Sequence, residues 1–334
     1  MSLSFQVYRG SKEGRIVPDQ TTRSLGPNEV YIETTHSGLC GSDEHYLRSG
    51  QVLGHEGVGV VKEIGSSVTN VKVGDRVGFG YTQEVCGLCD SCLSGWDQYC
   101  SNKKEYGRHN HDVGSFSSGV VWNAGSVFPI PDRYDSKDAA PLMCAGGTVW
   151  TCLSEYGARP GDRVGVIGIG GLGHLAIKLA AAMGCHVVAL SGSDTKKEEA
   201  FGFGASEYYV FSAGKEYNDL KPLKHLLVCA NANIDYASLI SIMDIGGTIY
   251  PLTVDFRPSS VPLLPMTGKG VRLQGSLVAS RRTLKSLLEF AAEKKITPTI
   301  MTFPLNETGI EDAMQTLREG KMRYRGVLVR ECAR

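Results

Sequence analysis

Four cysteines stand close together in the first third of the chain, in the order Cys-x-x-Cys-x-x-Cys-x7-Cys: Cys86, Cys89, Cys92 and Cys100. Tetrahedral Zn²⁺ bound by four thiolates at about 2.3 Å needs ligands on a flexible loop, and two-residue gaps provide that. Four thiolates leave no open coordination position, so this kind of site stabilises a fold and does not turn over substrate. Free or redox-active thiols are the alternative, and a nucleic-acid-binding zinc ribbon is disfavoured because the segment is acidic. We predict a structural zinc lobe at about 84–101.

Three residues that are farther apart suit a second, open zinc site: Cys40, His55 and Cys144. Two thiolates and one imidazole neutralise the charge of Zn²⁺ and leave the fourth position for water or a substrate oxygen. Taken singly, each of these residues would more often be a core or surface residue, so the case depends on their contexts in the sequence.

A glycine-rich turn of the form G-x-G-x-x-G spans 168–173 and contains Gly168, Gly170, Gly171, Leu172 and Gly173. Glycine is abundant in this chain, so the motif alone is a weak signal. Its context strengthens it, because the turn follows an apolar run and opens an amphipathic segment. The turn is therefore predicted to bind a dinucleotide pyrophosphate, with the helix N-terminus favouring the anion.

These motifs together resemble the zinc-dependent medium-chain alcohol dehydrogenases, in particular their cinnamyl-alcohol-dehydrogenase-like branch. The matching motifs cover nearly the whole chain in the order of the family: Cys40-x-Ser42-Asp43-x-His45, Gly54-His55-Glu56, the cysteine quartet, Cys144-Ala-Gly-Gly-Thr148, Gly168–His174 and Lys321-x-Arg323-Tyr324-Arg325. The resemblance implies that Cys40, His55 and Cys144 hold the catalytic zinc. It also implies that Glu56 is a neighbouring or transient ligand, that Asp43 orients the ligand histidine, and that Thr148 contacts the nicotinamide side of the cofactor.

A proton relay is expected beside the catalytic zinc. An alcohol must lose its proton before hydride leaves its carbon, and that proton needs a route to solvent. Ser42, two residues after a ligand, can accept it, and His45 can pass it to water. A hydroxyl bonded to its own backbone and a solvated surface histidine are the alternative interpretations.

The cofactor is expected to be NADP(H), because no carboxylate stands at the end of the second strand to bind a ribose 2′-hydroxyl. The segment there is Ser191-Gly-Ser-Asp-Thr-Lys196-Lys197. The resemblance implies that Ser191 and Lys196 contact a 2′-phosphate. Gly192 replaces a residue that is often polar or basic, and the two lysines could instead be the solvated start of a helix.

The elements that must position these residues change in character near residue 145. Up to that point the chain reads as short strands and loops, including Val58–Ile64 and a strand–turn–strand over 71–77. Beyond it, a strand at Arg163–Gly168, a helix over 172–184 and a strand at His186–Ser191 form a βαβ unit. The pattern recurs weakly: Leu226–Cys229 and Thr248–Leu252 are expected as strands, Ser238–Ile245 as a helix and Val271–Leu277 as a strand. A last helix at Thr283–Lys295 and a closing strand at Arg325–Val329 complete the chain.

We therefore expect an α/β protein with a GroES-like β-rich catalytic domain over 1–145 and a Rossmann doubly wound parallel-sheet domain over 146–275. Residues 276–334 are expected to return to the catalytic domain. Only nine residues separate His45 from His55, and because the family usually has a longer loop at 46–54, the substrate entrance is expected to be wider or its specificity altered.

Composition narrows the classes of function. The 35 basic and 35 acidic residues give no net charge, so the basic surplus that nucleic-acid binding needs is absent. The longest apolar stretch, at 174–191, is interrupted by polar residues, which argues against a membrane span. The chain has ten cysteines, and its start shows no pattern of a secretory leader. We therefore expect the cysteines to bind metal rather than form disulfides, and we expect a cytoplasmic location.

The leading hypothesis is an NADP(H)-preferring zinc alcohol dehydrogenase or aldehyde reductase with two zinc ions per chain, most simply a homodimer. The alternatives are an NAD-dependent secondary-alcohol or polyol dehydrogenase, a C=C or C=N reductase, and a non-catalytic zinc scaffold protein.

Overall fold

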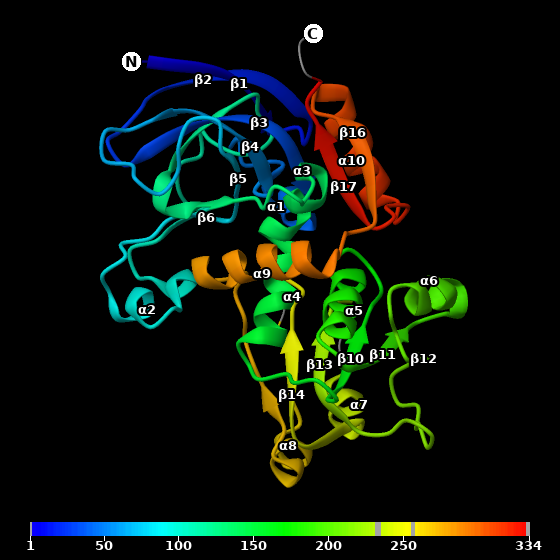
Figure 1. Cartoon of the computed structure of the whole chain (residues 1–334). Helices are drawn as coiled ribbons and strands as arrows, with labels where there is room; N and C mark the ends of the chain where they lie inside the picture. The colour runs from blue at the N-terminus through cyan, green and yellow to red at the C-terminus, as the bar shows by residue number, and fades with distance from the viewer. Residues whose placement is uncertain (1, 231–234, 255–257, 332–334) are drawn as a thin grey trace. The chain divides into compact units, whose positions relative to one another are not determined.

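The computed structural model describes residues 2–230, 235–254 and 258–331. The chain forms two compact units (Figure 1): unit 1 comprises Met1–Gly147 and Val278–Arg334, and unit 2 comprises Thr148–Leu277. The chain passes from unit 1 to unit 2 within helix α4 (Ala145–Ser154). None of the helices in the described residues is long and apolar enough to cross a membrane.

Unit 1 is rich in β-structure. Its first part contains β1 (Ser2–Gly10), β2 (Ile16–Ser24), β3 (Glu29–Leu39), α1 (Gly41–Tyr46), β4 (Gly57–Ile64), β5 (Arg76–Phe79), β6 (Thr82–Glu84), α2 (Asp90–Leu93), η1 (Asp97–Tyr99), β7 (Lys104–Glu105), β8 (Val120–Asn123), η2 (Ala124–Ser126), β9 (Val127–Pro129), α3 (Ser136–Ala139) and η3 (Ala140–Met143). Its second part contains α9 (Arg281–Lys294), β16 (Ile300–Pro304), α10 (Glu307–Arg318) and β17 (Arg325–Val329).

The main sheet of unit 1 joins both parts of the chain. Its strands lie in the order β16-β17-β3-β4-β5-β9, and β8 also pairs with β3. β17 runs antiparallel to β3, with Gly326 opposite Leu39, so the end of the chain lies beside the strand that leads to Cys40. Alternate residues of β3, including Val30, Ile32 and Thr34, are buried, as expected for a strand with one face on a core.

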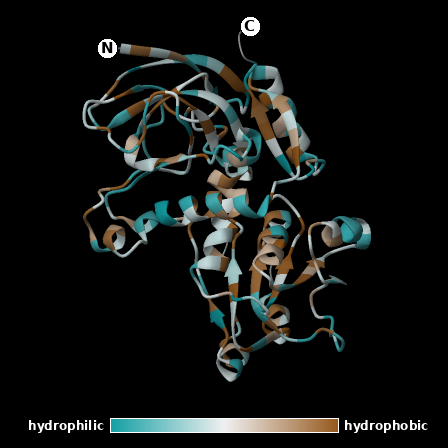
Figure 2. Cartoon of the chain, viewed as in Figure 1, coloured by the Kyte–Doolittle hydropathy of each residue, from teal (hydrophilic) through white to brown (hydrophobic). Residues whose placement is uncertain are grey.

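Unit 2 is a parallel sheet with helices. Its elements are β10 (Arg163–Ile167), α5 (Gly173–Ala182), β11 (His186–Ser191), η4 (Asp194–Lys196), α6 (Lys197–Gly202), β12 (Glu207–Val210), β13 (Leu223–Val228), α7 (Tyr236–Ser241), β14 (Met243–Pro251), α8 (Leu263–Lys269) and β15 (Arg272–Leu273). The strand order β12-β11-β10-β13-β14-β15 is that of a doubly wound dinucleotide-binding fold. Its central strands β10, β11 and β13 are largely apolar (Figure 2), because helices cover a parallel sheet on both faces.

Several expected elements differ from those observed. Ser238–Ile245 is not one helix, because α7 ends at Ser241 and β14 begins at Met243. The strand expected over 271–277 is only Arg272–Leu273, and the one expected over 71–77 begins only at Arg76. Thr283–Lys295 is not the last helix, since α10 follows it; the side chain of Asn306 caps α10 by accepting from the Gly309 N–H at 2.8 Å.

Candidate active site

The open metal site forms where two paired strands of unit 1 meet. β3 and β4 are antiparallel, with Ser37 opposite Gly57, so the end of β3 lies beside the start of β4. Cys40 follows β3 directly and His55 and Glu56 precede β4, which brings these three residues together. Cys144 joins them from the turn between η3 and α4, since η3 packs against both strands.

The ligand atoms of Cys40, His55, Glu56 and Cys144 all lie within 4.8 Å of one another, and all four residues are buried. His55 supplies the test of whether a metal fits. Its Nδ1 bonds the carboxylate of Asp43 at 2.9 Å, whereas its Nε2 is buried and has no hydrogen-bond partner among the described residues. A buried ring nitrogen without a partner costs free energy unless something binds it, so the site fits a metal that takes the Nε2 lone pair.

The surroundings of the two thiols, Cys40 and Cys144, shift their pKa values in opposite directions. A hydrogen bond from Cys144 is the largest cause that lowers the pKa of Cys40, and His55 and Arg325 lower it further. The same contact and burial raise the pKa of Cys144. The contact therefore favours the thiolate at Cys40 and the thiol at Cys144, and a metal ion bound by both sulfurs would displace the remaining proton.

Asp43 is hydrogen-bonded to two of the candidate metal ligands, Cys40 and His55. It is fully buried in α1, and its Oδ2 accepts from the backbone N–H of Cys40 at 3.0 Å. Its Oδ1 accepts from His55 Nδ1 and from the hydroxyl of Tyr106, both at 2.9 Å. Although burial disfavours the imidazolium, Asp43 raises the pKa of His55 above its ordinary value. A carboxylate in this place fixes the tautomer that leaves Nε2 available.

Glu56 is held in an ion pair rather than left free. Its Oε2 accepts from Arg325 at 2.5 Å and its Oε1 accepts from the Ala145 N–H at 3.2 Å. Arg325 lies in β17, beside β3, and is 4% exposed. Burial raises the pKa of Glu56 to about 7, while Arg325 opposes that rise. The carboxylate thus sits at the edge of the site with both oxygens already hydrogen-bonded.

The two residues predicted to form a proton relay, Ser42 and His45, lie on α1, which follows Cys40 directly. Ser42 is half-buried and His45 is exposed, one helical turn farther on. Residues three apart are neighbours on a helix surface, so the predicted relay has a half-buried hydroxyl two residues after Cys40 and an exposed histidine next to it on the helix.

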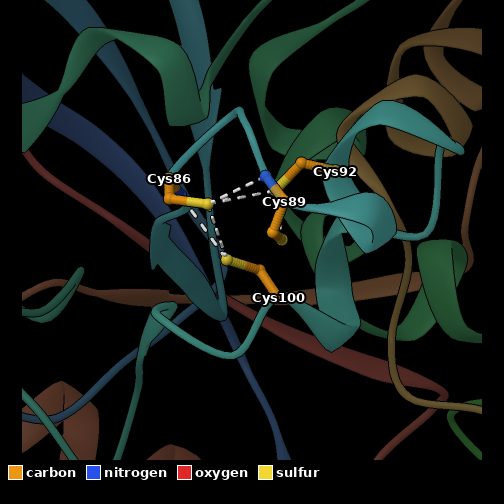
Figure 3. A group of neighbouring side chains, drawn as sticks. All are labelled: Cys86, Cys89, Cys92 and Cys100. Atoms are coloured by element: carbon orange, nitrogen blue, oxygen red, sulfur yellow. Dashed lines mark hydrogen bonds between the residues drawn. The ribbon is translucent and has the colours of Figure 1, made fainter.

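The cysteine quartet forms a separate cluster in the lobe between β6 and β7. Three of its Sγ–Sγ distances are 3.9 Å for Cys86–Cys92, 3.6 Å for Cys89–Cys92 and 3.5 Å for Cys86–Cys100. Four sulfurs at about 2.3 Å from one tetrahedral ion stand about 3.8 Å apart, and a disulfide would need about 2.05 Å. The four side chains converge on one point (Figure 3), so the quartet fits a structural zinc ion.

Backbone N–H groups support these sulfurs. Cys89 donates to the sulfur of Cys86 at 3.4 Å, and Cys86 donates to that of Cys100 at 3.5 Å. Bonds from Leu88 and Cys89 lower the pKa of Cys86 to about 6, which favours the thiolate that a metal needs.

The glycine-rich turn of unit 2 has the geometry that a pyrophosphate requires. Gly168 has a φ of +89°, a conformation that side chains rarely adopt. A Cβ at Gly173 would collide with the Gly168 carbonyl, so the first turn of α5 packs closely against β10. A Cβ at Gly170 would meet nothing within 4 Å, so the backbone there is open to a ligand. Glycine has three functions in a dinucleotide-binding turn: it permits the tight turn, it lets the backbone approach the pyrophosphate, and it allows close packing of the helix against the strand. Gly168, Gly170 and Gly173 match these functions in that order.

The expected phosphate contacts lie close to this turn. Ser191 ends β11, and Lys196 donates from Nζ to the carbonyl of Ile169 within the glycine-rich turn at 2.7 Å. The Lys196 ammonium is therefore held against the glycine-rich turn, where the sequence predicts that the cofactor binds. Thr148, half-buried, lies in α4.

A buried site of two thiolates and one imidazole, together with a sheet of the dinucleotide-binding order, defines a zinc- and nicotinamide-dependent dehydrogenase. Comparisons with known proteins agree. The model of the alcohol dehydrogenase GroES-like domain matches residues 26–132, and that of the zinc-binding dehydrogenases matches residues 171–293.

Among curated proteins, the chain is 35% identical over 323 residues to the NADP-dependent alcohol dehydrogenase C 1 of Mycolicibacterium smegmatis, with 92% of each chain covered. Among solved structures, it resembles a cinnamyl alcohol dehydrogenase of Sorghum bicolor, with a TM-score of 0.91, 29% identity and 98% of each chain covered. It also resembles the enzyme CAD of Helicobacter pylori complexed with NADP(H), with a TM-score of 0.88, 25% identity and 98% and 99% of the two chains covered. The chain belongs to the zinc-dependent medium-chain alcohol dehydrogenase family, in its cinnamyl-alcohol-dehydrogenase-like branch, and the family resemblance and the fold class expected from the sequence are confirmed.

Sequence reasoning assigned no role to two residues that the structure places at the site. Arg325 was part of a matching motif, but its ion pair with Glu56 joins residues that lie 269 positions apart. Tyr106 stands in an irregular segment, and no local pattern marks it as a partner of Asp43.

Proposed function

We propose that this protein is an NADP(H)-preferring zinc-dependent alcohol dehydrogenase and aldehyde reductase. The observation that carries the proposal is the buried group of Cys40, His55 and Cys144, in which the unpartnered Nε2 of His55 faces two thiols. In this proposal these three residues hold the catalytic zinc and the cysteine quartet holds a second, structural zinc.

A zinc ion at the first site supplies Lewis-acid polarisation of the substrate oxygen, which favours hydride transfer between the substrate carbon and the nicotinamide. Asp43 holds the imidazole in the tautomer that leaves Nε2 available. Arg325 holds the Glu56 carboxylate in an ion pair, which keeps it from occupying the position meant for substrate. Ser42 exchanges a proton with the alcohol oxygen and His45 exchanges it with water, so the charge does not accumulate in the buried site.

The preference for NADP(H) is supported by the end of β11, where Ser191 stands in place of a carboxylate. An acidic residue there would repel a 2′-phosphate, whereas the ammonium of Lys196 attracts it. The relative from M. smegmatis is named as NADP-dependent, and the enzyme from H. pylori was solved with NADP(H), which supports the same preference.

A homodimer fits the surface of unit 2. β15 is the last strand of the described parallel sheet, and large apolar side chains near it are exposed: Ile245, Leu263, Leu264 and Leu273. Apolar side chains gathered at a sheet edge favour association. None of the nine described cysteines is in a disulfide, which supports the proposed cytoplasmic location.

The proposal is tested with a panel of aliphatic and aromatic aldehydes, ketones and enals, each assayed with NADPH and with NADH. We expect aldehydes to be reduced with NADPH preferred, and enals to give allylic alcohols. A saturated aldehyde as the enal product would identify a C=C reductase, and a preference for NADH with ketones or polyols would identify the NAD-dependent alternative. If the zinc-loaded protein turns over none of these substrates, the remaining interpretation is a non-catalytic zinc scaffold protein.

A further inference from the structure

Tyr106 is a buried phenol that the chemistry above does not use. It is 2% exposed and lies directly behind the ligand histidine. Its hydroxyl donates to Asp43 Oδ1 at 2.9 Å, the same oxygen that accepts from His55 Nδ1 at 2.9 Å. Its ring lies against the imidazole of His55, with centroids 4.5 Å apart and planes inclined by 31°. One side chain therefore contacts both members of the Asp43–His55 pair.

We propose that Tyr106 is a positioning residue for the catalytic metal site, acting on His55 by a tilted ring contact and on Asp43 by a hydrogen bond. This inference rests on the proposed zinc site. The ring packed against His55 limits rotation of the imidazole about its bond to the chain. The hydroxyl fixes the Asp43 carboxylate, to which the imidazole Nδ1 is hydrogen-bonded. Together they keep Nε2 directed toward the sulfurs of Cys40 and Cys144.

Tyr106 also contacts both ends of the loop at 46–54. The hydroxyl of Tyr106 accepts from the backbone N–H of Gly54 at 3.2 Å, and Tyr46 at the start of the loop packs edge-on against its ring at 5.2 Å. Gly107 leaves room for that packing, since a Cβ there would overlap the Tyr46 ring. Tyr106 thus connects the two ends of the loop at 46–54, and it holds Gly54, the residue that precedes His55.

Asp43 Oδ1 has two donors in the structure, the hydroxyl of Tyr106 and the imidazole Nδ1 of His55, each at 2.9 Å. The carboxylate oxygen is therefore shared between the two groups, and the phenol limits how strongly it pulls on the imidazole proton. Groups of this kind behind a metal ligand typically change metal affinity by about 10–100-fold.

The experiment compares Tyr106→Phe with Tyr134→Phe. Tyr134 is also buried in unit 1, and its hydroxyl donates to one backbone carbonyl, that of Ile296, at 2.6 Å. Both variants lose one buried hydroxyl, but only Tyr106 contacts Asp43 and His55. The release of the two zinc ions to a chelator is followed with a colorimetric indicator, and the visible spectrum is recorded after Co²⁺ replaces the catalytic zinc.

We expect Tyr106→Phe to release one zinc roughly tenfold faster and to shift the Co²⁺ bands, while the other zinc keeps its rate and Tyr134→Phe changes neither. An unchanged release rate together with an unchanged spectrum in Tyr106→Phe would overturn the positioning role. If wild-type protein holds no zinc at the first site, the proposed function fails instead, so the two failures are distinguishable.

A double-mutant cycle with Asp43→Asn tests whether the hydroxyl acts through the carboxylate. We expect Tyr106→Phe to add little to the faster release in the Asp43→Asn background. Fully additive effects would contradict the proposed route. The release rate of the structural zinc in the same samples reports whether each variant has kept its fold.

Discussion

Arg325→Met is the substitution that tests most directly how the active site tolerates its buried charges. The change keeps a long apolar stem and removes the guanidinium that bonds Glu56 at 2.5 Å. Glu56 is then a buried carboxylate with one backbone donor, the Ala145 N–H. Because one of its oxygens lies within 4.8 Å of the neighbouring ligand atoms, the freed carboxylate would compete for the open metal position.

The magnitude follows from burial. Arg325 and Glu56 are 4% and 0% exposed, and removing one partner of a buried ion pair typically costs about 3–5 kcal/mol. At roughly 2–4 °C per kcal/mol for a unit of this size, the melting temperature should fall by at least about 6 °C. The double variant Arg325→Met, Glu56→Gln should recover most of this loss, because it leaves no unpaired charge.

The assay combines chemical denaturation with zinc content and turnover. The control is Arg133→Met, whose partner Glu289 is 4.0 Å away on the surface and whose loss should cost under about 1 kcal/mol. We expect Arg325→Met to keep its zinc, to lose stability and to turn over slowly. A cost as small as that of Arg133→Met, or no recovery in the double variant, would refute this account of the ion pair.

Three further predictions follow from the remaining groups. Ser42→Ala should slow turnover by about 10²–10⁴-fold at unchanged zinc content, and undiminished turnover would remove the relay. Lys196→Ala should raise KM for NADPH roughly tenfold, with little change for NADH, whereas Lys197→Ala serves as the matched control and should change neither; equal effects of the two variants would contradict the phosphate contact. Hydrogen bonds from Arg163 and His186 lower the pKa of Glu207 from 4.5 to about 2, so this group stabilises the fold above about pH 4.5 and loses that contribution as the pH falls toward 2. Denaturation midpoints of Glu207→Gln should therefore fall less steeply between pH 6 and 3 than those of the wild type, and parallel curves would contradict that assignment.

The parts of the fold that the sequence predicted well are those whose signals are local. The strand expected at His186–Ser191 coincides with β11, and the one at Arg325–Val329 with β17, because both are short apolar runs with clear ends. Helix α10 was missed although Ile310, Ala313 and Met314 form its buried face. Gly309 in its first turn lowers helix propensity and obscures the periodicity.

The active site was less predictable where its contacts join distant residues. Cys40 and His55 are near in sequence and are positioned by one pair of strands, so their motifs sufficed to suggest a site. Arg325 reaches that site only because β17 pairs with β3, and Tyr106 only because an irregular segment packs under the short loop. Such contacts depend on tertiary packing, which neither residue type nor spacing reveals.

The central claim is that Cys40, His55 and Cys144 gather around one metal ion while the quartet holds another. A crystal of the zinc-loaded protein, measured at the zinc absorption edge, tests this claim most directly. We predict two anomalous peaks per chain, one among the four sulfurs of the quartet and one between His55 Nε2 and the sulfurs of Cys40 and Cys144. A single peak at the quartet, with no ion between Cys40 and Cys144, would contradict the account.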